Sequence, residues 1–258
     1  MAAPLLEVHG VTLQYKTREH LVTATYRVDF SVLRSDRFVL LGPSGCGKSS
    51  LLKAVGGYLK PVEGEIRLKG APVLKPGPDR MMVFQEFDQL LPWLTVTQNV
   101  AFPLTASRRL SVREARDKAR QYVDKVGLTG FEDRHPHELS GGMRQRVAIA
   151  RSLAYDPDVL LMDEPFAALD ALTRRKMQEE LLALWDDTRF TVLFVTHSIP
   201  EAIRIGSRIL LLSPHPGQVK AEINSLPADA ASAAVAALEA RIHGMLFADA
   251  VEEEEVHG

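Results

Sequence analysis

The chain has a single cysteine and no long apolar segment, and these two shortages exclude several classes of protein. One cysteine, Cys46, cannot form a disulfide within the chain, which suits a reducing compartment. Because no run of about 18 or more apolar residues occurs, no helix is predicted to span a bilayer. The first residues, 1–5, lack a basic stretch followed by an apolar one, so we expect no signal peptide.

The chain also lacks an excess of charge of either sign. Its 31 Lys and Arg residues and 33 Asp and Glu residues give a formal net charge of −2 at pH 7. Domains that bind nucleic acid usually carry a basic excess, so we expect no nucleic-acid partner. With 258 residues, 46% of them hydrophobic and 25% charged, the chain has the composition of a globular protein with a substantial core.

Strand patterns alternate with helical patterns, which is typical of an α/β fold around a mostly parallel sheet. Early segments alternate apolar and polar residues and are predicted to be half-buried strands; they are 6–13, 27–32 and 64–70. Continuous apolar runs are predicted to be strands covered on both faces; they are 80–84, 158–162, 191–195 and 208–212. The region from about Asp88 to Ser152 has mainly helical spacing, and we expect an inserted helical subdomain there.

Capping patterns mark some of the expected helices. Ser111 and Glu114 have the spacing of a capping box. Beyond Pro227, one helical face is predicted to carry Val235, Leu238, Ile242 and Met245. This last helix is expected either to pack on the core or to contact a partner. The acidic run 252–255 is predicted to be a solvated, frayed tail.

The phosphate-binding pattern G-x-x-x-x-G-K-S/T is matched by Gly42-Pro43-Ser44-Gly45-Cys46-Gly47-Lys48-Ser49. The match follows an apolar strand pattern, 38–41, and precedes a helical one, as the motif requires. Glycines let successive backbone N–H groups point at one anion, and the helix N-terminus adds a positive dipole end. We therefore predict a nucleoside triphosphate site where Lys48 reaches the β- and γ-phosphates and the Ser49 hydroxyl holds Mg²⁺.

Two acids, Asp163 and Glu164, end the apolar strand 159–162. Ligands bind at the carboxyl ends of strands in parallel sheets, so both side chains are expected at the same site. Asp163 is predicted to support the Mg²⁺ shell, and Glu164 to orient and deprotonate the attacking water.

A second anion-binding helix start is predicted at Ser140-Gly141-Gly142, because a serine can cap the helix and small residues let the backbone approach a phosphate. With Leu139 before it and Arg146 after it, this segment resembles the signature of ABC transporter nucleotide-binding subunits, commonly L-S-G-G-Q. Met143 replaces the glutamine, which removes one polar side chain and leaves the Ser-Gly-Gly contacts intact.

The resemblance covers about 5–213 and implies a fold: a RecA-like P-loop NTPase core with an N-terminal antiparallel β subdomain and the inserted helical subdomain. It implies one ATPase domain over 1–213 and a C-terminal helical extension with an acidic tail over 214–258. It also implies that Tyr15 stacks on adenine, although Tyr15 could instead be a core residue and Tyr26 is a weaker rival.

The resemblance completes the expected site. The predicted catalytic residues are Lys48, Gln85, Glu164 and His197. The predicted metal ligands are Ser49, Gln85 and Asp163. Besides the phosphate-binding loop Gly42–Ser49, the predicted nucleotide contacts are Tyr15, Ser50, Gln85, Ser140, Gly141, Gly142, Asp170 and His197. Asp170, in Ala168-Leu169-Asp170, is implied to communicate across a dimer, and His197 to contact the γ-phosphate.

Ser198 stands where the family often has aspartate after this histidine, and with Glu201 it forms a capping-box pattern for the next helix. In the family, the Ser140–Gly142 segment of one copy closes over ATP held by the phosphate-binding loop of another. The resemblance thus implies a head-to-tail dimer with a second ATP-binding subunit, expected to be an identical copy, although the residues do not exclude a different one.

The run Leu90-Leu91-Pro92-Trp93 is similar to the nitrate, sulfonate and taurine importer class. That resemblance implies permease subunits in the membrane, indirectly a periplasmic or extracellular solute-binding protein, and a peripheral position on the cytoplasmic face of the bacterial inner membrane. Trp93 is expected either to face the permease or to lie in the core. Two other functions stay open: a soluble ABC-type ATPase outside transport, and a non-catalytic nucleotide-binding regulator, against which Lys48, Glu164 and His197 argue.

Overall fold

The structure is a computed structural model that describes residues 3–16, 20–85, 89–227 and 230–255. Within these ranges the chain forms two compact units. The first contains 1–76 and 191–258, and the second contains 77–190. The expected start of the helical subdomain at Asp88 lies outside the described residues.

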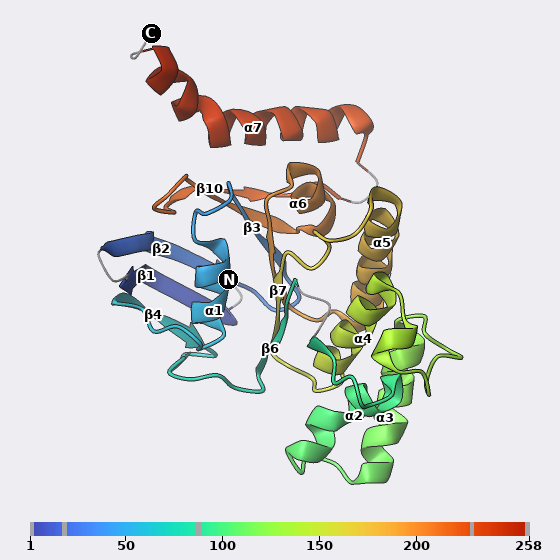
Figure 1. Cartoon of the computed structure of the whole chain (residues 1–258). Helices are drawn as coiled ribbons and strands as arrows, with labels where there is room; N and C mark the ends of the chain where they lie inside the picture. Colours follow the sequence, from blue (N-terminus) through green and yellow to red (C-terminus); the bar gives the residue numbers. More distant parts are fainter. Residues whose placement is uncertain (1–2, 17–19, 86–88, 228–229, 256–258) are drawn as a thin grey trace. The chain divides into compact units, whose positions relative to one another are not determined.

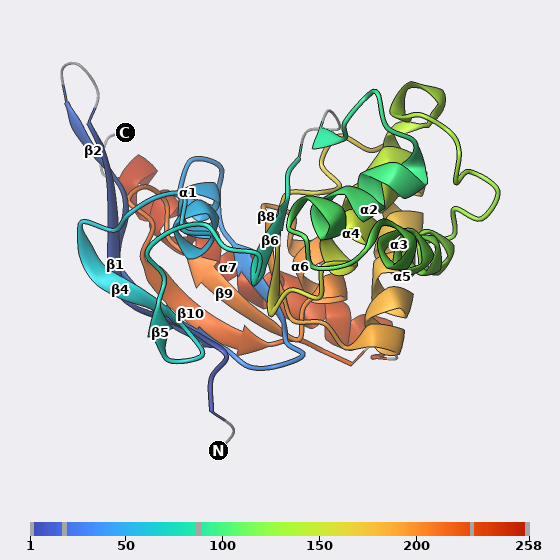
Figure 2. The same cartoon turned by 90° about the horizontal axis from the view of Figure 1, so that it is seen from below.

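The first unit begins with an antiparallel sheet of order β2-β1-β4-β5 (Figure 2). Its strands are β1 Leu6–Lys16, β2 Leu21–Val32, β4 Glu63–Leu68 and β5 Ala71–Pro72. Register shifts interrupt the pairing of β1 with β2, beginning between Val8 and Val11. This sheet confirms the antiparallel β subdomain expected at the N-terminus.

A second sheet of the first unit carries the strand that leads into the phosphate-binding loop. Strand β3, Arg37–Leu41, pairs in parallel with β8, Val192–Thr196, and with β9, Arg208–Leu212. The residues of β8 are all buried, as the continuous apolar run predicts. At the edge, β10, Val219–Asn224, pairs antiparallel with β9. The sequence analysis does not predict β10, which precedes the helix expected beyond Pro227.

The described residues of the first unit include the helices α1 Lys48–Val55, α6 Ile199–Ile205 and α7 Ser232–Glu255. Helix α7 contacts α6 (Figure 1), with Leu238, Ile242 and Leu246 buried. Of the two expected roles for this helix, packing on its own chain is the one observed. Helix α7 continues to Glu255, so the acidic run belongs to this helix; glutamates are good helix formers.

The second unit pairs β6, Arg80–Val83, in parallel with β7, Val159–Asp163. Its helices are α2 Val96–Ala106, α3 Val112–Lys125, α4 Gly141–Leu153 and α5 Ala171–Thr188, with a short 3-10 helix η2 at Pro136–Glu138. Helices α2, α3 and α4 pack together (Figure 2), in the region predicted to be helical. The predicted capping box at Ser111 and Glu114 begins α3. Together the two units confirm the α/β class.

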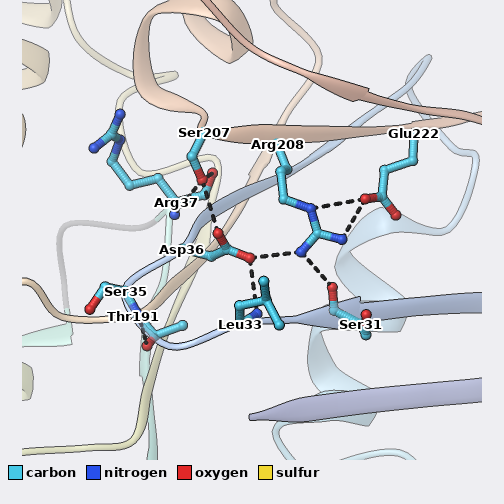
Figure 3. Close-up of polar contacts among 9 residues, drawn as sticks. All are labelled: Ser31, Leu33, Ser35, Asp36, Arg37, Thr191, Ser207, Arg208 and Glu222. Atoms are coloured by element: carbon cyan, nitrogen blue, oxygen red, sulfur yellow. Dashed lines mark hydrogen bonds and ion pairs between the residues drawn. The ribbon is translucent and has the colours of Figure 1, made fainter. Parts of the chain in front are cut away.

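A polar network ties the amino end of β3 to β9 and β10 (Figure 3). Arg208 Nη1 lies 2.7 Å from Asp36 Oδ2 and donates to the Ser31 carbonyl at 3.0 Å. Arg208 Nε donates to Glu222 Oε1 at 2.9 Å. Neighbouring charge-assisted hydrogen bonds hold the pKa of Arg208 above its usual range, although its burial acts in the opposite direction. The network stabilises the amino end of β3, which is the end opposite the phosphate-binding loop.

Candidate nucleotide site

The phosphate-binding loop joins β3 to α1 and has the backbone that its glycines predict. Gly45 has a φ of 81° and Gly47 a φ of 92°, in the left-handed region that glycine enters at low cost. A Cβ at Gly47 would lie 2.5 Å from the Ala24 carbonyl oxygen, so the loop also approaches β2 too closely for a side chain. The loop can curl its N–H groups around an anion because both positions are glycine.

Lys48 lies inside this loop. Its side chain is 4% exposed, and Nζ donates to the carbonyl oxygens of Gly42 and Pro43 at 2.8 Å each. An ammonium group that donates to neutral carbonyls can also bind phosphate oxygens. The first turn of α1, which the structure describes in full, carries no acidic residue, and its dipole therefore favours an anion.

Cys46 is fully buried in the loop, with its sulfur 3.8 Å from Lys48 Nζ. Burial raises the pKa of the Cys46 thiol, which outweighs the lowering effect of the nearby lysine. The thiol is therefore neutral and fills space in the loop.

Tyr15, at the end of β1, lies beside this loop. Its hydroxyl donates to Ser50 Oγ at 2.7 Å, and its side chain is 38% exposed. This exposure excludes the core alternative for Tyr15 and leaves the ring accessible. Tyr26, the weaker rival, is 41% exposed and stacks with the guanidinium of Arg27 at 5.4 Å.

His197 follows the carboxyl end of β8, beside the carboxyl end of β3 where the phosphate-binding loop starts. Thr196 on β8 pairs with Leu41 on β3, so His197 and Gly42 are the next residues on two neighbouring strands. His197 is exposed. Its position therefore suits the expected contact with a phosphate.

The capping pattern after His197 is only half realised. Ser198 Oγ accepts from the Glu201 N–H, as expected, and α6 begins there. The expected return bond is replaced: Glu201 Oε2 accepts the Thr196 hydroxyl at 2.5 Å, and the Ser198 N–H donates to Thr196 Oγ1. The buried Thr196 hydroxyl therefore bonds both the Ser198 N–H and the Glu201 carboxylate, and it joins the end of β8 to α6.

In the second unit, the register of β6 and β7 brings Gln85 and the acid pair to one edge. Val83, the last residue of β6, pairs with Met162 on β7. Gln85 therefore lies two residues after Val83, and Asp163 lies one residue after Met162. Glu164 has a φ of 45°, an uncommon conformation for a residue with a side chain. Such strained positions concentrate at functional sites, because the surrounding structure must hold them.

The segment Ser140–Gly142 starts α4 as predicted. Ser140 Oγ accepts from the Met143 N–H at 3.3 Å and caps the helix. A Cβ at Gly142 would lie 3.2 Å from Thr173 Cγ2, so this glycine also lets α4 pack closely on α5. Its small size has a structural reason in addition to the predicted approach of a phosphate.

Asp170 also has a local role that the sequence analysis does not assign. It caps α5, with Oδ1 accepting the N–H groups of Leu172 and Thr173 at 3.1 and 3.0 Å. Hydrogen bonds from the Thr173 side chain, foremost, and from the N–H groups of Thr173 and Leu172 hold the pKa of Asp170 below its usual range. Its role across a dimer stays a prediction.

The sequence analysis misses the residues that hold the Gln85 segment. Gln145, fully buried on α4, donates to the Phe84 carbonyl at 3.4 Å and accepts from Gln89 at 3.2 Å. Arg151 donates to the Gln89 carbonyl at 2.8 Å. Their signal in the sequence is weak, because a glutamine or arginine on a helix is usually solvated.

The oxygen-bearing side chains predicted as metal ligands suit Mg²⁺, which binds partly through water and phosphate, rather than a metal bound by protein ligands alone. Among the described residues, no group of three or more His, Cys, Asp or Glu side chains could hold a metal ion. Mg²⁺ prefers oxygen ligands and is usually bound by one or two carboxylates, waters and substrate phosphates. The Ser49 hydroxyl, the Asp163 carboxylate and the Gln85 amide oxygen have this character.

These features define the class: an α/β protein with a P-loop for nucleoside triphosphates. The family model described as ABC transporter matches residues 26–167. The chain belongs to the ABC transporter family, as an ATP-binding subunit with the ATP-hydrolysing cassette of that family.

Relatives with assigned functions agree with this family. The chain is 50% identical over 203 residues to the taurine import ATP-binding protein TauB of Rhizobium johnstonii, covering 79% of this chain and 77% of that protein. It is 44% identical over 223 residues to the aliphatic sulfonates import ATP-binding protein SsuB of Bacillus cereus, covering 86% and 87%. It is 44% identical over 203 residues to the nitrate import ATP-binding protein NrtD of Synechococcus elongatus, covering 78% and 74%.

A solved structure is also similar. The dimeric ATP-binding cassette MJ0796 in a post-hydrolysis state, bound to ADP and Pi, aligns with a TM-score of 0.72 and 33% identity. The alignment covers 86% of this chain and 99% of that one. The helices in the described part of this chain are all too short or too polar to cross a bilayer.

Proposed function

We propose that the chain hydrolyses Mg-ATP in a head-to-tail dimer and so drives solute uptake through a membrane permease of the nitrate, sulfonate and taurine type. The observation that carries this proposal is the buried Lys48 inside the loop between β3 and α1. The names of the relatives TauB, SsuB and NrtD support the importer class.

The residue roles in this proposal follow from their chemistry. Lys48 and the N–H groups of the phosphate-binding loop bind the β- and γ-phosphates, and the exposed Tyr15 ring stacks on the base. Mg²⁺, held by Ser49, Asp163 and Gln85, would neutralise charge on the phosphates.

The reaction is transfer of the γ-phosphoryl group to water. Glu164 orients the attacking water and takes its proton, and ADP leaves with the electron pair of the broken P–O bond. His197 contacts the γ-phosphate, and Gln85 contacts the attacking water.

The N-terminus of α4 suits the second half of a composite site. Ser140 and Gly141 are accessible at this helix start, and the helix dipole favours an anion there. In the proposed dimer, Ser140–Gly142 of one subunit closes over the ATP of the other, so ATP holds the dimer together and hydrolysis releases it. Coupling then follows if the permease has different affinities for the two states.

A surface on the second unit suits the permease. Trp93 is 70% exposed and Phe102 46% exposed, so the core alternative for Trp93 does not apply. Next to Trp93, a groove of about 400 Å³ is lined by Leu94, Phe102 and Arg116, among others. Large aromatic side chains often anchor interfaces. This docking would hold the chain at the cytoplasmic face of the inner membrane, with a solute-binding protein acting on the far side.

The test is to purify the membrane complex, add candidate solutes with their binding protein, and measure ATP hydrolysis. We expect a sulfonate or oxyanion such as taurine or nitrate to stimulate hydrolysis, and Trp93→Ala to lose this stimulation while the isolated subunit keeps its basal rate. An ATPase that copurifies with no membrane protein and responds to no solute would favour the alternative, a soluble ABC-type ATPase.

A further inference from the structure

The turn between β9 and β10 lies directly against the phosphate-binding loop. A Cβ placed on Gly217 would be 2.1 Å from the Cys46 carbonyl oxygen, far inside van der Waals contact. Gly217 is buried, and its φ lies outside the left-handed region. The close approach of the loop, rather than the backbone dihedral, is therefore the reason for glycine at this position.

Gly217 is held in place from two other sides. Its N–H donates to the Ala24 carbonyl at 3.0 Å, and its carbonyl accepts the Tyr26 N–H at 2.9 Å. The turn is also closed on itself: the Ser213 N–H donates to the Gln218 carbonyl at 2.8 Å, and the Gln218 N–H to Ser213 Oγ at 2.9 Å. Because Gly217 is tied on both its backbone groups, an added side chain would displace Cys46 rather than the turn.

The loop is packed closely on other sides as well, so a displacement of Cys46 would disturb the rest of the loop. On one side Gly47 meets β2, where an added Cβ would lie 2.5 Å from the Ala24 carbonyl oxygen. On another side Gly42 meets the end of β9, where an added Cβ would lie 2.9 Å from the Leu212 carbonyl oxygen. The loop is thus packed between β2, β9 and the β9–β10 turn.

We propose that Gly217 is a positioning residue for nucleotide binding: without a side chain, it lets the β9–β10 turn seat the Cys46–Gly47 part of the phosphate-binding loop. The peptide between these residues carries the Gly47 N–H, one of the donors proposed to bind the phosphates. Hydrogen bonds weaken steeply when distance and angle depart from ideal values, so a shift of this peptide lowers affinity. The inference rests on the proposed nucleotide site.

The experiment compares the full-length protein with Gly217→Ala. Titration with a fluorescent ATP analogue and Mg²⁺ should give a dissociation constant about tenfold higher in the variant. Cys46, the only cysteine in the chain and a buried one, gives an independent readout. Its reaction with a thiol reagent should be about tenfold faster in the variant, because the displaced loop exposes it.

Two control variants separate this role from general destabilisation. Gly64→Ala creates a similar clash, with a Cβ 2.3 Å from the His9 carbonyl oxygen, in the antiparallel sheet. Gly244→Ala adds a methyl group in open space on α7. Both should keep the parent's nucleotide affinity and thiol reactivity, even where Gly64→Ala lowers the melting temperature.

If Gly217→Ala does not fold, Ser213→Ala tests the proposal instead. This variant removes the bond from the Gln218 N–H to Ser213 Oγ without adding a clash. We expect faster Cys46 labelling and a two- to fivefold weaker affinity, roughly, from the loosened turn. Parent-like nucleotide affinity and Cys46 labelling in a folded Gly217→Ala would overturn the proposal. If Gly217→Ala does not fold, the same result in Ser213→Ala would overturn it. Lys48→Ala tests the nucleotide site separately: if it binds the analogue as the parent does, the proposed function fails rather than the role of Gly217.

Discussion

The side-chain amides of Gln145 and Gln89 meet in the second unit, with Gln89 Nε2 donating to Gln145 Oε1 at 3.2 Å. Gln145 also donates to the carbonyl of Phe84, the residue before Gln85. The helix that begins at Ser140 is therefore bonded to the segment that carries a predicted ligand of Mg²⁺ and water. Through this contact, a shift of Gln85 and a shift of α4 are mechanically linked.

We predict that Gln145→Met slows ATP turnover by about tenfold while nucleotide affinity changes little. The substitution keeps the volume of the side chain and removes its hydrogen bonds, at a cost of about 1 kcal/mol in unfolding free energy. Steady-state hydrolysis and analogue titration provide the two measurements. Ser152→Ala is the control: it removes a buried hydroxyl that bonds within the same helix, to Ala148, and turnover should stay at the parent rate. Parent-like turnover in folded Gln145→Met would disprove the link.

The network around Arg208 yields a prediction about stability (Figure 3). Asp36 is 13% exposed at its side chain and Arg208 18%, so Arg208→Met leaves a carboxylate largely buried without its cation. We expect a loss of about 2 kcal/mol in urea unfolding, below the range for fully buried pairs. Nucleotide affinity should not change, since the network lies at the opposite end of β3.

An exposed ion pair gives the matched control. Arg67 lies 2.8 Å from Glu65, with a side chain 42% exposed. Arg67→Met should cost less than about 1 kcal/mol, because exposed pairs contribute little. Equal losses in the two variants would contradict the assignment of the Arg208 network as a structural tie.

The most local features could be predicted from the sequence. The phosphate-binding loop, the cap at Ser140 and the capping box at Ser111 depend on residues within a few positions of one another. Strand β10 is missed, although Val219–Asn224 alternates apolar and polar residues as a half-buried strand does. It is an edge strand in which Ile223 alone is buried.

Tertiary contacts account for the other differences. Glu201 was expected to reach back to the Ser198 N–H, but the hydroxyl of Thr196 competes for its carboxylate. Gly217 and Cys46 meet across most of the chain, and the Pro216-Gly217 pair indicates only a turn. Such contacts depend on how the strands pair in the folded chain, and a pattern of neighbouring residues in the sequence does not predict that pairing. The catalytic and ligand-binding roles of the site residues stay predictions.

The thiol of Cys46 gives a prediction about pH. Burial raises the pKa of this group, and the thiolate is the form that reacts. The labelling rate should therefore rise at higher pH than for the same cysteine in urea, when measured from about pH 7 to about pH 10. Mg-ATP should slow labelling further by ordering the loop. A rate profile with its midpoint at or below that of the unfolded chain would contradict the buried, neutral thiol.

The central claim is that this chain hydrolyses ATP in a dimer that ATP holds closed, with Glu164 as the base. Glu164→Gln tests it most directly, with hydrolysis and oligomeric state measured on the same sample in Mg-ATP. The account predicts parent-like nucleotide binding, turnover lowered by at least about a hundredfold, and a stable dimer in size-exclusion chromatography. Undiminished hydrolysis, or a variant that stays monomeric with bound ATP, would contradict it.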